Sequence, residues 1–102
     1  MTPSDENLTG ACLRLPDHVV HRSFAEETVV LNLRTARYHG LNRSGGYMLE
    51  VLTTSPDVGT AAGEIAKHYG QGIEVVSSDL TEFCRNLLDR GLVEIVDEHP
   101  SA

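Results

Sequence analysis

At 102 residues the chain has the size of one domain, and its content of 40% apolar and 23% charged residues is that of an ordinary globular protein. Fifteen acidic residues against eight lysines and arginines give a net charge of −7, which repels phosphate backbones and disfavours nucleic acid as a partner. No apolar run approaches the roughly 18 residues of a membrane span, and the start is polar and acidic rather than a signal peptide, so a cytoplasmic protein is expected.

Two segments at the ends carry too few apolar residues to fold, and one domain lies between them. Residues 1–10 are expected to be disordered, residues 11–96 to form the domain, and residues 97–102 to be a polar tail. After residue 10, Ala11–Leu15 alternates weakly, Pro16 introduces a turn or kink, and an extended pattern resumes at Val19. This pattern predicts one interrupted strand or two short strands.

The stretch Thr28–Asn42 predicts a β-hairpin with its turn at Arg34–Arg37. Its first strand alternates, with Val29, Leu31 and Leu33 on one face and Val30 and Asn32 on the other. Three arginines and no acidic residue lie between Thr28 and Leu49, so the hairpin is basic in an acidic protein. Two interpretations stay open: the second strand is an edge on which another chain docks, or the arginines only keep an ordinary edge soluble.

Three helices follow the hairpin. The first is predicted to begin with Ser44 as its N-cap and to end before Pro56; the second opens at Asp57 or Val58 and stops at Gly70. The third runs from Glu74 or Val75 to Arg90, and a short strand, Leu92–Val96, comes last. Strands, three helices and a strand indicate an α+β fold with helices packed on a small antiparallel sheet.

The third helix has an unusually wide apolar stripe. Val76, Leu80, Phe83 and Leu87 form it, and Cys84 with Leu88 widens it beyond the roughly 100° that one core contact uses. Either one edge of this stripe is available to a ligand, or the stripe covers the hairpin completely.

The residues predict neither an enzyme nor a metal or cofactor site. Of the five histidines, His18 and His21 point to opposite faces of an extended segment, without a cysteine or carboxylate that would complete a ligand set. Cys12 and Cys84 form no C-x-x-C pair and are expected to be reduced thiols rather than a disulfide. Cys84 lies within a helix without an adjacent base, so packing is expected rather than nucleophilic chemistry.

An ordered set of motifs resembles a known family. The set comprises Val29–Asn42, Ser44-Gly45, Glu64-Ile-Ala-Lys-His-Tyr-Gly70, Asp79-Leu80 with Phe83, and Leu87 with Gly91-Leu92. Together these motifs resemble the PqqD-like family, whose members are recognition elements for the precursors of ribosomally synthesised and post-translationally modified peptides (RiPPs). The likeness covers about Leu13 to Ile95 and is greatest to the small, discrete proteins of lasso-peptide biosynthesis.

The resemblance implies a winged helix-turn-helix-like fold, with a three-stranded antiparallel sheet and three helices, that binds a leader peptide without catalysis. In the family, the leader lies as an added strand against the third strand, facing the third helix, and a typical lasso leader offers a Tyr and a Pro. The resemblance then assigns the receiving edge to Arg37, Tyr38, His39, Gly40 and Leu41, and the opposing wall to Val76, Asp79, Leu80, Phe83, Cys84 and Leu87. Arg34 and Arg37 are expected to attract acidic leader residues.

Three functions are therefore compared. The first is a peptide-binding module that presents the leader to a separate leader protease of the cysteine protease type and then to the macrolactam-forming cyclase. The second is a PqqD-like chaperone that delivers a precursor to a radical maturation enzyme. The third, a winged-helix DNA-binding regulator, is disfavoured because the third helix carries Glu74, Asp79, Glu82 and Asp89 against Arg85 and Arg90.

Overall fold

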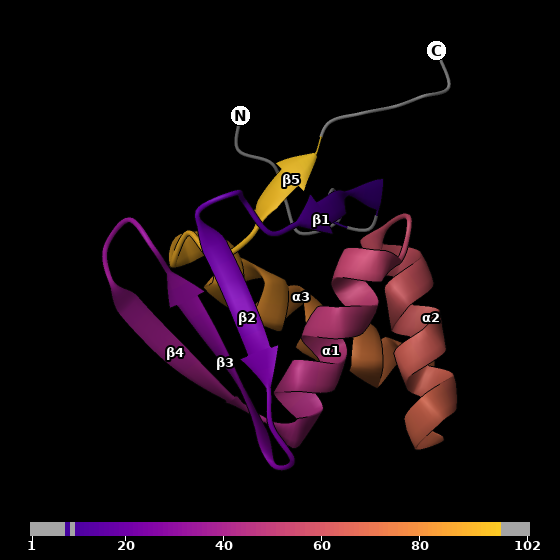
Figure 1. Ribbon diagram of the computed structural model, residues 1–102. Coiled ribbons are helices and arrows are strands. Elements are labelled where there is room, and N and C mark those ends of the chain that lie inside the picture. Colours follow the sequence, from indigo (N-terminus) through magenta and orange to yellow (C-terminus); the bar gives the residue numbers. More distant parts are fainter. Residues whose placement is uncertain (1–7, 9, 97–102) are drawn as a thin grey trace.

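A computed structural model describes residues 8 and 10–96 of the chain (Figure 1). The segments predicted as a disordered start and a polar tail fall largely or wholly outside the described residues, although Leu8 packs against the core. The elements in order are β1 (Cys12–Arg14), β2 (Val19–Ser23), β3 (Glu27–Asn32), β4 (Arg37–Asn42), α1 (Arg43–Thr54), α2 (Val58–Tyr69), α3 (Ile73–Asp89) and β5 (Glu94–Val96). The predicted α+β fold, a three-stranded antiparallel sheet followed by three helices, is confirmed.

The strands belong to two separate sheets. The larger sheet has the order β2-β3-β4, with Val20 opposite Leu31 and Leu31 opposite Tyr38. The smaller one pairs β1 with β5, and the Arg14 Nε lies 2.6 Å from a Glu94 carboxylate oxygen across that pair. Of the two alternatives before the hairpin, two short strands is therefore correct.

The sheet buries the face of β3 that carries fewer apolar residues. Thr28, Val30 and Asn32 are buried, whereas Val29 and Leu31 are half-buried on the opposite face. The side-chain oxygen of the buried Asn32 has hydrogen-bond partners, because it accepts from the backbone N–H groups of Arg34 and Thr35. The polar residue on the buried face therefore shapes the turn between β3 and β4.

The first helix begins earlier than predicted, with a different cap. Asn42 is the N-cap of α1, since its side-chain oxygen accepts a 2.8 Å hydrogen bond from the Gly45 N–H; Ser44, the predicted cap, lies inside the helix. Asparagine and serine cap about equally well, and the chain turns into the helix directly from β4. Gly46 lets α1 approach β3, because a Cβ there would lie 3.0 Å from the Cβ of Thr28.

The other two helices follow the predicted boundaries closely. Asp57 caps α2 through a 2.7 Å hydrogen bond from the Thr60 N–H, and Gly70 ends the helix in the left-handed conformation. Helix α3 starts at Ile73, one residue before the predicted range, and Gly91 follows its end with a φ of +71°.

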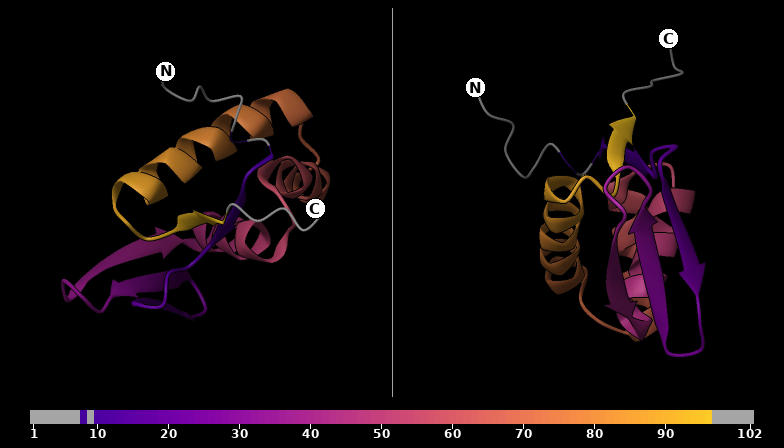
Figure 2. Two further views of the ribbon diagram at one scale, coloured as in Figure 1. Left: turned by 90° about the horizontal axis from the view of Figure 1, so that it is seen from above. Right: turned by 60° about the vertical axis from the view of Figure 1, so that its left-hand side comes forward.

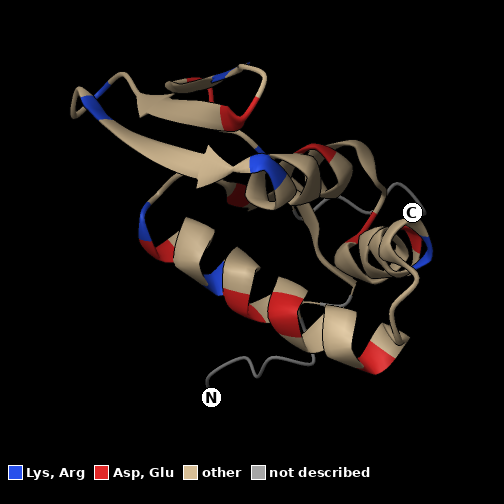
Figure 3. Cartoon of the chain, turned by 90° about the horizontal axis from the view of Figure 1, so that it is seen from below, with Lys and Arg blue, Asp and Glu red and all other residues tan. Residues whose placement is uncertain are grey.

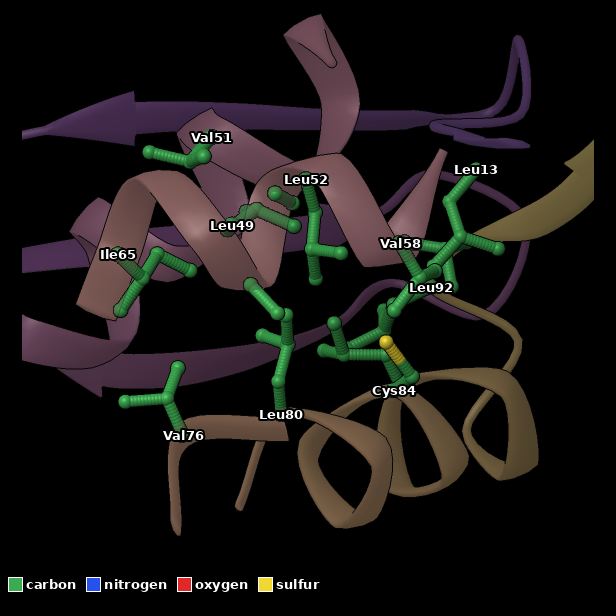
Figure 4. Close-up of a cluster of buried hydrophobic side chains, with 14 of the residues drawn as sticks. Leu13, Leu49, Val51, Leu52, Val58, Ile65, Val76, Leu80, Cys84 and Leu92 are labelled. Atoms are coloured by element: carbon green, nitrogen blue, oxygen red, sulfur yellow. The ribbon is translucent and has the colours of Figure 1, made fainter. Parts of the chain in front are cut away.

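The core lies between the sheet and the helices. Figure 4 shows Leu49 and Leu52 of α1 meeting Ile65 of α2 and Leu80 of α3. In Figure 2 the described helices lie on one side of the β2-β3-β4 sheet, and no described element covers its other side. Among the described residues, the outer edges of β2 and β4 have no strand partner, and one sheet face is left uncovered.

Candidate functional site

Strand β4 is an edge strand. Among the described residues it pairs with β3 only, and the first described strand, β1, pairs with β5 instead of closing that edge. An edge strand presents backbone N–H and C=O groups to another chain.

The register identifies which backbone groups face outward. The Phe24 N–H donates to the Glu27 carbonyl, and the Leu33 N–H donates to the carbonyl of His18, so odd-numbered residues of β3 bond toward β2. Hydrogen bonding alternates along a strand, and hence the even-numbered residues Thr28, Val30 and Asn32 bond toward β4.

The partners of those three residues in β4 are Leu41, His39 and Arg37. The backbone groups of these three residues are therefore used within the sheet. Tyr38 and Gly40 alternate with them, so their N–H and C=O groups point away from β3 to the outer edge. Two residues thus offer two donors and two acceptors to a guest strand.

Side chains of β4 divide between the two faces of the sheet. Arg37, His39 and Leu41 lie opposite the buried face of β3 and so share the side of the helices, where Leu41 packs against the core. Tyr38 lies on the other face and is 72% exposed. All five predicted edge residues are on β4. Arg37, His39 and Leu41 bond to β3, whereas the backbone groups of Tyr38 and Gly40 face the outer edge.

The structure places most of the residues of the predicted α3 wall in the core. Leu80 and Cys84 are fully buried, Val76 and Leu87 nearly so, and all four pack in the core (Figure 4). In this conformation the rest of the core covers these four side chains. Of the predicted wall, only Asp79, which is exposed, and Phe83, which is half-buried, remain accessible.

A side-chain hydrogen bond links the C-cap of α3, Arg90, to β4. The Arg90 Nη1 lies 3.3 Å from the His39 Nδ1, an arrangement in which the guanidinium donates, since arginine carries no acceptor. Asp79, Phe83, Asn86 and Arg90 recur at spacings of four, three and four residues and so lie along one side of α3. Because Arg90 reaches His39, this row is the side of α3 turned toward β4.

Asn86 and Arg90 were not among the predicted site residues. Their helical spacing from Phe83 is the signal that would have found them. A prediction based only on the apolar stripe leaves these polar residues out. The charged residues of α3 are mostly acidic, as the red segments of Figure 3 show, whereas Arg34 and Arg37 lie in and after the hairpin turn. An acidic α3 is unsuited to a DNA groove.

Other chemistry has little support in the described residues. Burial raises the pKa of the Cys84 thiol to about 11, so the thiol stays protonated near neutral pH and is not an activated nucleophile. Both cysteines are free thiols. In the described part of the chain, no three His, Cys, Asp or Glu side chains gather as a metal site, and none of its helices has the length and apolarity to cross a membrane.

Comparisons with known proteins show the family and the fold. The family described as Coenzyme PQQ synthesis protein D (PqqD) matches residues 27–93. A solved structure of TbiB1 in complex with the TbiA(beta) leader peptide has a TM-score of 0.75 and 27% identity, covering 83% of this chain and 99% of that one.

A second structure, lasso peptide synthetase B1 complexed with the leader peptide, has a TM-score of 0.74 and 18% identity, covering 82% of this chain and 99% of the other, and supports the fold alone. No curated protein matches the chain.

Proposed function

Since the chain belongs to the PqqD family, we propose that it binds the leader segment of a ribosomally synthesised precursor peptide by strand addition to β4. The observation that carries the proposal is the outward direction of the Tyr38 and Gly40 backbone groups on an edge strand. Backbone pairing supplies affinity that is indifferent to sequence, and the adjoining side chains select among peptides.

The selecting side chains are those along the accessible side of α3. Phe83 supplies the apolar contact, Asp79 and Asn86 flank it, and Arg90 with His39 closes one end. A half-buried Phe83 ring offers a surface for a leader Tyr or Pro. The core residues Val76, Leu80, Cys84 and Leu87 hold α3 in place and take no direct part.

The bound leader would then be presented to separate enzymes. The 27% identity to TbiB1, whose structure contains a leader peptide, favours a lasso-type system with a leader protease and a macrolactam-forming cyclase as partners. Delivery to a radical maturation enzyme is the second candidate, because the description of the matching family names a protein of coenzyme PQQ synthesis. Both candidates use the same edge and row, and the chain itself acts without catalysis.

A binding experiment tests the proposal. A fluorescently labelled lasso-type leader peptide that contains a Tyr and a Pro is titrated with the protein, and a labelled DNA duplex is titrated at the same physiological salt. The leader should bind with submillimolar or tighter affinity and the duplex should not, because the surface of α3 is acidic. Tight DNA binding without leader binding would refute the proposal.

A matched pair of variants locates the contact. Phe83 and Leu88 are both half-buried and both pack against the core, but they lie on opposite flanks of α3. Phe83→Ala should weaken leader binding about tenfold, the effect of truncating a central apolar contact, while Leu88→Ala should leave it unchanged. Equal losses in both variants would place the leader elsewhere.

A further inference from the structure

Two basic side chains from different elements meet beside the open edge of β4. The Nη1 of Arg90, at the C-cap of α3, donates to the Nδ1 of His39 over 3.3 Å. His39 lies opposite Val30, which is buried, so the His39 side chain is on the helix side of the sheet. The imidazole is half-buried and Arg90 is exposed, so a guest strand on β4 would find both side chains accessible.

This contact leaves hydrogen-bond donors beside the edge, without an acceptor. A neutral imidazole that accepts at Nδ1 carries its proton on Nε2, and a guanidinium that gives one bond to His39 keeps its other N–H donors. Arg37 lies two residues before His39, on the same face of β4, and adds a second positive charge to that of Arg90. A carboxylate complements such a group of donors and charges.

The described part of the chain does not neutralise these charges. Among the residues that the structure describes, neither Arg37 nor Arg90 forms an ion pair. Asp89 precedes Arg90 in the chain but does not pair with it. Glu27 also lies beside β4, next to Gly40, but on the outer face of the sheet. The positive charge on the helix side is therefore available to a guest.

A guest strand on β4 would bring one of its side chains to this pair of residues. Residues directly across from each other in a sheet point to the same face, with Cβ atoms about 5 Å apart. The guest residue across from His39 would therefore point toward α3 and reach the guanidinium of Arg90. We infer that Arg90 and His39 form a subsite for a carboxylate, hereafter the carboxylate subsite, which selects Asp or Glu at that position of the leader. The inference rests on the proposed function.

Arg90 and His39 have different roles in the carboxylate subsite. Arg90 supplies the charge and the donors that bind the carboxylate. His39 is a positioning residue, because an exposed arginine otherwise samples many rotamers and the bond to His39 holds the guanidinium beside the edge before a guest binds.

Glu27 limits the preference to one face of the guest. The guest residue across from Gly40 would point to the outer face, where a Glu27 carboxylate oxygen lies 3.9 Å from the position of a Cβ on Gly40. A second acidic side chain there would face a like charge. An acidic residue is therefore favoured across from His39 and disfavoured at the next position, across from Gly40.

A glutamate scan of the leader tests the carboxylate subsite. The probe is the fluorescently labelled lasso-type leader that contains a Tyr and a Pro. Each of its other positions is replaced in turn by Glu and, in a second set of peptides, by the uncharged Gln. Fluorescence anisotropy with the full chain gives the dissociation constants, and the ratio of the Gln constant to the Glu constant at each position isolates the effect of charge.

The ratio should be about five at one position, the effect of one exposed charged contact, and below one at an adjacent position. Arg90→Gln should reduce the high ratio to about one. Arg85→Gln is the matched control, since it removes a guanidinium from another side of the same helix and should leave the ratio at about five. His39→Ala keeps the charge of Arg90 but releases its side chain, so the ratio should fall part of the way. Glu27→Gln should raise the low ratio to about one.

Circular dichroism checks that each variant is folded, and a general loss of affinity changes both peptides alike and leaves the ratio unmoved. A ratio near one at every position, in a protein that binds the leader, overturns the inference. So does a preference for Glu that survives Arg90→Gln, or one of equal size along the whole peptide, which indicates general attraction to the hairpin arginines. A wild-type protein that binds no peptide of either set refutes the proposed function and the subsite with it, a result distinct from binding without a charge preference.

Discussion

Replacing Gly40 by proline tests the direction of the backbone groups on β4. Proline removes the N–H of residue 40, which points to the open edge, and leaves the bonds of His39 and Leu41 to β3 intact. There is room for the proline Cβ, because the nearest atom to a Cβ at Gly40 would be a Glu27 carboxylate oxygen at 3.9 Å. The fold should therefore survive a change that alters the receiving edge.

The expected loss of leader affinity follows from one bond and one obstruction. A hydrogen bond removed from the guest costs about 1 kcal/mol, or roughly fivefold in the dissociation constant. The pyrrolidine ring also occupies the position of the N–H and holds the guest away, which brings the total to at least about tenfold. Stability should change by about 1 kcal/mol or less, since proline also restricts the unfolded chain.

Fluorescence anisotropy of the labelled leader measures the affinity, and circular dichroism measures the thermal stability. Gly40→Ala is the matched control: it keeps the N–H, has space for its methyl group and should bind leader nearly as well as wild type. His39→Pro is the opposite control, since it removes a donor to β3 and should lower the melting temperature. A folded Gly40→Pro that binds leader with wild-type affinity would refute the strand-addition reasoning.

Three further predictions concern the core, a helix cap and a thiol. Leu80→Ala should lower the free energy of unfolding by about 2–5 kcal/mol in chemical denaturation, because Leu80 is fully buried; an unchanged stability with weaker leader binding would instead place it in the peptide site. Asp57→Ala should cost about 1 kcal/mol by removing the cap of α2. Hydrogen bonds from Thr60 lower the pKa of the Asp57 carboxyl, so the stabilisation by this cap is present above the ordinary pKa of Asp and is lost as pH falls through the pKa in the folded protein. The difference in melting temperature between wild type and Asp57→Ala should therefore close in acid. A difference that widens in acid contradicts the capping role. At neutral pH a thiol reagent should modify Cys12 and spare Cys84 until the protein unfolds, as counted by mass spectrometry; prompt modification of Cys84 in folded protein contradicts its burial.

Local patterns predicted the elements of this fold well. Alternation identified the β3–β4 hairpin, and Pro56, Asp57, Gly70 and Gly91 marked helix boundaries, because each of these residues acts through its own backbone or its immediate neighbours. The N-cap of α1 was assigned to Ser44 instead of Asn42, since a residue that ends a strand was not considered as the cap of the helix that follows.

Features that depend on distant contacts were beyond such patterns. Periodicity shows that α3 has a wide apolar stripe, but only packing against α1 and α2 decides that Leu80, Cys84 and Leu87 are covered while Phe83 is half-exposed. Likewise, the pairing of β1 with β5 joins residues about 80 positions apart, which no local signal specifies. The receiving edge was predicted as a segment, and its two outward residues required the register.

The β1–β5 pair also bears on how this domain can be joined to other proteins. Cys12 and Val96 are strand partners, so the first and last described strands lie together at one corner of the domain, away from β4 in Figure 1. An enzyme fused genetically to either side would be tethered there and would not thread across the peptide edge. The architecture thus suits modular fusion, and a protease fused to the chain at this corner should leave the open edge of β4 accessible.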